Sequence, residues 1–247
     1  MTLSVGLAIT ALVLRNTLRT VRTGYLSVIS DPFLTPFLAM CLLGALYVAL
    51  SAALSVGRER EMGTLETLFY GPIGHLDYLV GKFVAHWLVF LAMLVAFSAG
   101  CIALSAMTHL RISTAIGGIV GLASVVALAF IGLGLVAATV MRSMRGSLLL
   151  FMGLVSAIVV VAGASYILNA VVAGRELLGL IPLRDAVYLL NRFVTWLSPV
   201  SYLLNGTDAA VRLNWAEWGR YAIGSLAYGL VALGLATSSL RRNGVMR

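Results

Sequence analysis

The chain has 247 residues, of which 61% are hydrophobic and 11% are charged, whereas a soluble domain carries about 25% charged residues. So much apolar surface cannot be buried in a core of this size, which excludes an ordinary soluble enzyme, a disordered protein and a disulfide scaffold. The net charge is +8, and in a membrane protein basic residues act mainly as topology signals in the loops. The composition therefore predicts a polytopic membrane protein.

The first segment, residues 1–24, combines a short apolar run with three arginines, Arg15, Arg19 and Arg22, on one helix face. The apolar run from Thr2 to Leu14 would form only about 20 Å of helix. The segment is therefore either a short, tilted first span whose arginines reach towards the headgroups, or an amphipathic helix lying in the interface. The first alternative predicts six crossings for the chain, and the second predicts five.

Five further stretches contain no charged residue and are long enough to cross a bilayer, which takes about 20 apolar residues. We expect helices, because lipid offers the backbone no hydrogen-bond partners and the runs do not alternate polar with apolar residues. The sequence therefore predicts an all-α polytopic membrane protein with about six transmembrane helices in a single domain, residues 1–247. The five expected spans are residues 34–56, 83–106, 113–141, 147–172 and 221–240.

Basic residues in the connections between these spans predict their orientation. Residues 58–82, residues 142–146 and the C-terminus together carry eight of the 17 basic residues. The positive-inside rule places these three regions in the cytoplasm. The long segment 173–220 is then expected outside.

The connection that follows the span 34–56 is the most informative part of the chain. Four of the nine acidic residues fall between positions 59 and 77, and Thr64 is placed to cap a short helix. Residues 62–72 are therefore predicted to form an amphipathic helix that docks on a partner, and a merely solvated charged loop is the alternative. The apolar stripe of this helix would consist of Leu65, Leu68 and Phe69.

Three motifs in this chain follow a recognisable order. The string E-R-E-x-G-T-L-E-x-L runs from Glu59 to Leu68 and is followed by Pro72. Gly81-Lys82 stands at the entrance of the next span, and Ser198-Pro199-Val200-Ser201-Tyr202 precedes the last span. In these motifs, across roughly residues 15–240, the chain resembles the ABC-2 type transporter permeases, which are the membrane subunits of ATP-binding-cassette exporters.

This resemblance implies a half-transporter that works with a second copy of itself or a homologous permease, and with a separate ABC ATPase subunit. It also implies six spans, a cytoplasmic coupling helix that contacts the ATPase subunit, and a short re-entrant hairpin outside, before the last span. The residues implied in ATPase coupling are Arg58, Glu59, Arg60, Glu61, Gly63, Thr64, Leu65, Glu66, Leu68, Phe69 and Pro72.

Residues 187–206 match the position of the re-entrant hairpin. The stretch is largely apolar, but Asn191 and Arg192 at its middle would be costly at the centre of a lipid-exposed crossing. Pro199 removes a helix hydrogen bond where a turn is needed. The hairpin would close the outer end of the pathway, and a plain interfacial helix on the outer leaflet is the alternative. The residues expected in this outer gate are Arg192, Trp196, Pro199 and Tyr202.

The sequence shows no nucleotide-binding motif. Gly81-Lys82 is followed by Phe83, and Leu76 stands where a phosphate-binding loop needs its first glycine. The three histidines, His75, His86 and His109, lack the spacing of metal ligands. We therefore expect no cofactor and no metal in this chain, with ATP bound by the partner subunit, and we expect membrane lipid around it and no nucleic acid.

The sequence thus predicts a non-catalytic permease subunit of an ABC exporter, a multi-pass protein of a prokaryotic cytoplasmic membrane that moves a hydrophobic or amphipathic substrate outward. One alternative is an ion-coupled secondary transporter and another is an intramembrane enzyme, although the expected spans hold no Asp or Glu. A third alternative is the membrane subunit of the cytochrome c maturation (haem) exporter, which residues 81–87 resemble.

Overall fold

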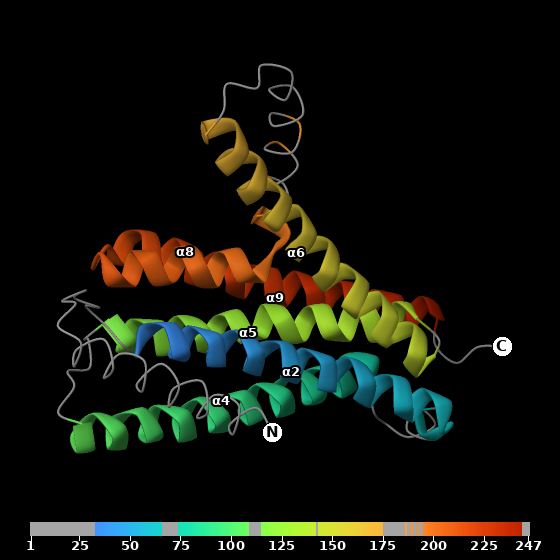
Figure 1. Ribbon diagram of the computed structural model, residues 1–247. Helices are drawn as coiled ribbons and strands as arrows, with labels where there is room; N and C mark the ends of the chain where they lie inside the picture. Colours follow the sequence, from blue (N-terminus) through green and yellow to red (C-terminus); the bar gives the residue numbers. More distant parts are fainter. Residues whose placement is uncertain are drawn as a thin grey trace.

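The computed structural model describes residues 33–65, 74–108, 115–141, 143–174 and 195–243, together with residues 186, 189 and 192, and describes side chains within α6 only as far as residue 161. All regular elements in these ranges are α-helices (Figure 1). Residues 1–24 lie outside the described residues. The helices are α2 (Leu34–Glu61), α4 (His75–Thr108), α5 (Ala115–Val140), α6 (Met144–Gly174), α8 (Pro199–Val211) and α9 (Trp215–Asn243).

Five of the described helices, α2, α4, α5, α6 and α9, are long and apolar enough to cross a membrane. This confirms the prediction of an all-α polytopic membrane protein. Each of the five charge-free stretches falls largely on one of these helices. The helix α4 has 34 residues and is therefore about 51 Å long, whereas the hydrocarbon core of a bilayer is about 30 Å thick.

Several helices extend further than the charge-free stretches from which they were predicted. The helix α2 begins at residue 34, as expected, but continues through the charged run to Glu61, and α4 begins at His75 instead of residue 83. Arg, Glu and Lys are good helix formers, so a charged residue ends the apolar span without ending the helix. The helix α2 ends at Glu61, and Gly63, two residues later, has a φ of +70°, the left-handed conformation that glycine supplies after a helix.

The helix α5 is the centre of the bundle and contacts all the other described helices. Small residues allow this close approach, as is common between membrane helices. A Cβ atom at Gly134 would overlap the backbone of Ala49 on α2, and a Cβ atom at Gly132 would lie 2.8 Å from Cβ of Ala232 on α9. The backbones of α2 and α9 therefore pack directly against α5.

The helix α8 packs against α5 and α9 and is joined to α9 by a tight turn at residues 212–214. In Figure 1 it begins part-way along the bundle and ends where α9 begins. Its first residue is Pro199, preceded by Ser198 in an extended conformation. Proline is favourable at the first position of a helix, where its missing N–H is not needed.

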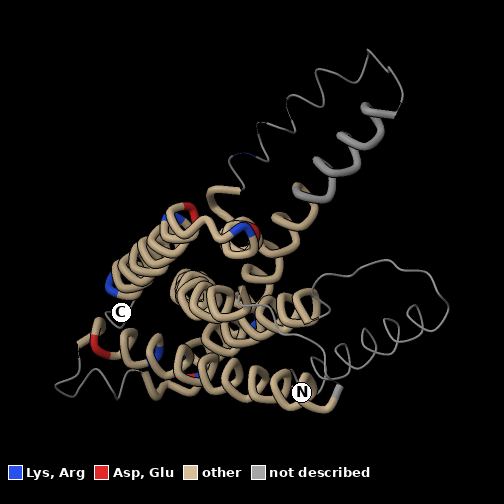
Figure 2. The backbone as a smooth tube through the Cα atoms, turned by 90° about the vertical axis from the view of Figure 1, so that its left-hand side faces the viewer, with Lys and Arg blue, Asp and Glu red and all other residues tan. Residues whose placement is uncertain are grey.

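The helix α6 slants away from the other helices (Figures 1 and 2). Its first residues pack against α2 and α5, but Leu149, Val159 and Val160 are exposed. Figure 2 shows that most of the described backbone carries uncharged residues. The charged residues of the described helices lie close to helix ends, and α5 has none.

Candidate functional site

The charged end of α2 meets three other helices at one end of the bundle. The helices α2, α5 and α9 run in one direction and α4 runs in the other, so the end of α2 lies beside the start of α4 (Figure 1). The short connection between α5 and α6 lies at the same end. We call Glu59, Arg60 and Glu61, with their partners Tyr78, Lys82, Met141 and Met144, the end cluster.

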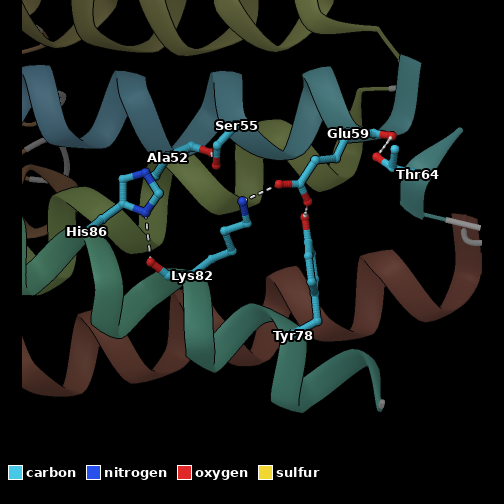
Figure 3. A network of polar contacts seen from close by, with 7 residues as sticks. All are labelled: Ala52, Ser55, Glu59, Thr64, Tyr78, Lys82 and His86. Atoms are coloured by element: carbon cyan, nitrogen blue, oxygen red, sulfur yellow. Dashed lines mark hydrogen bonds and ion pairs between the residues drawn. The ribbon is translucent and has the colours of Figure 1, made fainter. Parts of the chain in front are cut away.

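Glu59 joins α2 to α4. Its carboxylate forms an ion pair with the ammonium group of Lys82 and accepts a hydrogen bond from the Tyr78 hydroxyl (Figure 3). The side chains of Lys82 and Glu59 are 24% and 26% exposed, so this ion pair is less screened by water than a surface pair. The ring nitrogen Nδ1 of His86 donates to the Lys82 carbonyl at 2.7 Å. Tyr78, Lys82 and His86 are four residues apart and share one face of α4.

Arg60 and Glu61 join α2 to the ends of α5 and α6. The Arg60 guanidinium donates to the Met141 carbonyl at 2.7 Å, just after the last residue of α5. The Glu61 carboxylate accepts a hydrogen bond of 2.7 Å from the backbone N–H of Met144, the first residue of α6. A cation thus meets the negative end of one helix dipole, and an anion meets the positive end of another.

The residues that follow α2 turn the chain at this end. The Thr64 hydroxyl donates to the Glu59 carbonyl at 3.0 Å, and Leu65 is buried. Thr64 was expected as a helix cap, and here its side chain closes the end of the preceding helix. Of the expected coupling residues, Glu66, Leu68, Phe69 and Pro72 lie outside the described residues, as does most of the expected coupling helix 62–72.

The contacts of the end cluster hold four helices together. Each of the three charged side chains holds α2 to a different helix. In the described residues no group of His, Cys, Asp and Glu side chains is arranged to hold a metal ion. Glu59, Arg60 and Glu61 therefore couple helices to one another.

Arg58 differs from the other charged residues at the end of α2. It is exposed and lines a groove along α2 with Ser55, Leu54 and Met144. Sequence reasoning grouped it with Glu59, Arg60 and Glu61 for ATPase coupling. One residue step turns a helix by about 100°, which explains why the structure gives Arg58 different neighbours.

The four residues expected in the outer gate are also described. Arg192 and Trp196 are exposed, and Pro199 is buried at the start of α8. The Tyr202 hydroxyl donates to the Trp196 carbonyl at 3.1 Å. A cavity of about 180 Å³ is lined by Thr195, Trp196, Ser201, Tyr202, Asn205 and Tyr221. The helix α8 continues to Val211, five residues beyond the end of the expected hairpin 187–206, and the earlier half of that hairpin is only partly described.

Sequence reasoning missed the partners of the end cluster, namely Tyr78, Lys82, Met141 and Met144. Two of these partners contribute backbone atoms, which no sequence pattern reveals. A signal for the other two was present, because Tyr78 and Lys82 are one helix turn apart and Lys82 is the only lysine in the chain. Lys82 was noted only as part of a short motif and as one of the basic residues of the connection 58–82.

Five apolar helices with a charged cluster at one end, and with no charged side chain in the middle of a described helix, define a multi-pass membrane protein. The family description "ABC-2 family transporter protein" matches residues 4–245 of this chain. The chain therefore belongs to the ABC-2 transporter family, as the sequence motifs indicated, and is an ABC transporter permease. Permeases of this family generally work with an ABC ATPase and often form dimers. A search of curated proteins found no match to the chain.

Proposed function

We propose that this chain is the permease subunit of an ABC exporter that moves a hydrophobic or amphipathic substrate outward. A separate ATPase subunit binds and hydrolyses the ATP, and two permease chains, identical or homologous, form the pathway in a prokaryotic cytoplasmic membrane. Family membership supports the permease role and speaks against an ion-coupled carrier or an intramembrane enzyme. Nothing further supports the relation to the haem exporter.

The end cluster is the observation that carries this proposal. The segment 62–72, proposed as the coupling helix, follows directly on α2, and the last three residues of α2 hold α4, α5 and α6. A movement imposed on this segment by an ATPase subunit would reach four helices through charged contacts only one residue apart. Such contacts would transmit the movement while the backbone groups at the ends of α5 and α6 keep their hydrogen bonds.

The outer end fits the same proposal. The helix α8 begins part-way along the bundle and returns to its end, where the turn at 212–214 leads into α9 (Figure 1). This course supports the proposed re-entrant hairpin, with α8 as its second arm. Irregular backbone at membrane depth is tolerated where protein surrounds it, and Ser198 and Pro199 are both buried. In this proposal, residues 187–206 gate the pathway opposite the ATPase.

The test is a coupling measurement on the complex. The tagged full chain is isolated from its native membranes with its ATPase subunit and reconstituted into proteoliposomes, and ATP hydrolysis and outward movement of a fluorescent amphiphile are measured together. Glu59→Gln should lower the amount transported per ATP hydrolysed, because α4 is no longer held by an ion pair. Asp208→Asn, an exposed carboxylate on α8, is the matched control. Isolation without an ATPase subunit, or transport that needs no ATP, would contradict the proposal.

A further inference from the structure

The open face of α2 forms a groove of about 290 Å³ that the transport machinery described above does not use. It is lined by Tyr47, Leu50, Ser51, Leu54, Ser55 and Arg58 of α2 and by Met144 at the start of α6. The opposite face of α2 is buried against the bundle through Val48, Ala49, Ala52, Ala53 and Val56. The helix α6 slants away from α2 (Figure 1), and Met144 is the residue of α6 that lines the groove among the side chains that the structure describes.

The composition of this groove is amphipathic along its length. Tyr47, Ser51 and Ser55 repeat every four residues and so form one stripe, and leucines lie beside it. Tyr47 is 50% exposed. The Ser55 hydroxyl donates to the Ala52 carbonyl at 3.0 Å, so its oxygen remains available as an acceptor. Lipid tails offer no hydrogen-bond partner to the polar groups of this stripe. A few polar groups in an apolar groove are typical of a binding site for a small molecule.

Arg58 gives the groove a positive end. The two acidic residues nearest in sequence are engaged elsewhere, since Glu59 pairs with Lys82 and Glu61 accepts from Met144. The ion pair found among the described residues does not involve Arg58. An exposed guanidinium is well suited to a phosphate or carboxylate, which it can bind through two parallel hydrogen bonds.

The length of the groove matches one leaflet of a bilayer. Tyr47 and Arg58 are eleven residues apart, or about 16 Å along the helix, and half of the hydrocarbon core is about 15 Å. With Arg58 near the headgroups, Leu54 and Leu50 lie at the depth of the acyl chain and Tyr47 lies near the bilayer midplane. We propose that the α2 groove binds an anionic amphiphile from the inner leaflet, with its anionic group on Arg58 and its chain along the leucines.

This inference names the substrate class of the exporter, and treating the bound molecule as cargo rests on the proposed function. The site itself does not need the ATPase subunit. The full chain is therefore purified alone into nanodiscs containing equal amounts of phosphatidylglycerol and phosphatidylcholine, and the lipids retained are counted by native mass spectrometry. Wild-type protein should retain phosphatidylglycerol in preference to phosphatidylcholine.

Three variants distinguish binding of anionic lipid in the groove from non-specific attraction of anionic lipid to basic residues of the protein. Arg58→Gln should lower phosphatidylglycerol retention about tenfold, because the charge-assisted hydrogen bonds between the guanidinium and the lipid phosphate are lost. Arg58→Lys keeps the charge but loses the two parallel hydrogen bonds, and its retention should lie between wild type and Arg58→Gln. Arg242→Gln, an exposed arginine at the same end of the bundle, is the matched control and should match wild type.

Equal retention of both lipids by wild type, or wild-type retention by Arg58→Gln, would overturn the site. So would a disulfide between two chains carrying Leu54→Cys in native membranes, because a second copy would then cover the groove. In proteoliposomes with the ATPase subunit, anionic lipid should move outward in preference to zwitterionic lipid, and Arg58→Gln should abolish that preference. Loss of all ATP-driven movement in wild type would instead count against the proposed function and leave the binding result standing.

Discussion

Two neighbouring residues of opposite charge at the end of α2 each form a hydrogen bond with a backbone group at the end of a different helix. Arg60 donates to the last carbonyl beyond α5, and Glu61 accepts from the first N–H of α6. Ser143 directly precedes α6, and its hydroxyl accepts from the Gly146 N–H at 3.1 Å, which is the usual N-cap contact. The start of α6 thus has two caps, and one of them comes from another helix.

This arrangement predicts graded effects of substitutions at Glu61. Glu61→Gln keeps an oxygen acceptor for Met144 but loses the charge at the helix N-terminus, and should lower the free energy of unfolding by about 0.5 kcal/mol. Glu61→Ala loses both and should cost about 1 kcal/mol, similar to Ser143→Ala. Titration of the purified chain with sodium dodecyl sulfate in mixed micelles measures these differences. If Glu61→Ala is as stable as wild type, the cap from α2 contributes nothing.

The ion pair between Glu59 and Lys82 predicts a coupling between two helices. In a double-mutant cycle with Glu59→Gln and Lys82→Met, the interaction energy should be about 1 kcal/mol, at the upper end of the range for exposed pairs because both side chains are largely covered. The same unfolding titration provides the four free energies. Additive effects of the two substitutions would show that α2 and α4 are held by packing alone.

At the scale of elements, the position of α5 depends on its glycines. A Cβ atom at Gly134 would overlap the Ala49 backbone, which cannot move without separating α2 from α5. Gly134→Ala should therefore destabilise the chain by about 2 kcal/mol or more, as overpacked cores do. Gly117→Ala on the same helix has open space around its Cβ and should be neutral or slightly stabilising, because alanine is the better helix former. Equal thermal stability of the two variants would contradict this packing.

The existence of the spanning helices could be predicted from the sequence, whereas their ends could not. Charge-free stretches of sufficient length dictate helices in lipid, and the structure has an apolar helix at each of the five. The helix ends differ from the predicted span ends because charged residues such as those at 58–61 are unfavourable in lipid but are good helix formers, so the helix continues past the apolar span. The start of α8 was anticipated as a break at Pro199, which the helix uses as its first position.

The sequence predicted the charged residues of the candidate site, but it did not predict their partners within the chain. The charged run of α2 drew attention through its composition, but the sequence pattern placed it in a loop facing a partner. Its contacts within the chain join residues 19 to 83 positions apart. Such pairings follow from the packing of α2 against α4 and α5, which is set by small residues along the whole helix. Charge pattern alone could not distinguish a docking surface from an internal clamp.

At the scale of the whole molecule, charge differs between the two ends of the bundle. The end that holds the end cluster carries six described basic residues: Arg58, Arg60, Lys82, Arg145, Arg241 and Arg242. The opposite end, where α8 turns into α9, carries Arg212 and Arg220. Short segments rich in Lys and Arg remain in the cytoplasm. The same orientation would bring the end cluster to a cytoplasmic ATPase subunit and Arg58 to the inner leaflet.

Single cysteines test this orientation with little background, because the two native thiols, Cys41 and Cys101, are only 2% and 3% exposed. Arg145 and Asp208 are both exposed and lie at opposite ends of the bundle. In intact cells, Asp208→Cys should react with a membrane-impermeant maleimide added outside, whereas Arg145→Cys should react only after the membrane is opened. The wild-type chain should stay unlabelled in both conditions. Labelling of Arg145→Cys from outside would show that the orientation proposed here is reversed. The five described spans cross the membrane in alternate directions, so the side of one connection determines the side of all the others. It would also place the end cluster beyond the reach of any cytoplasmic ATPase.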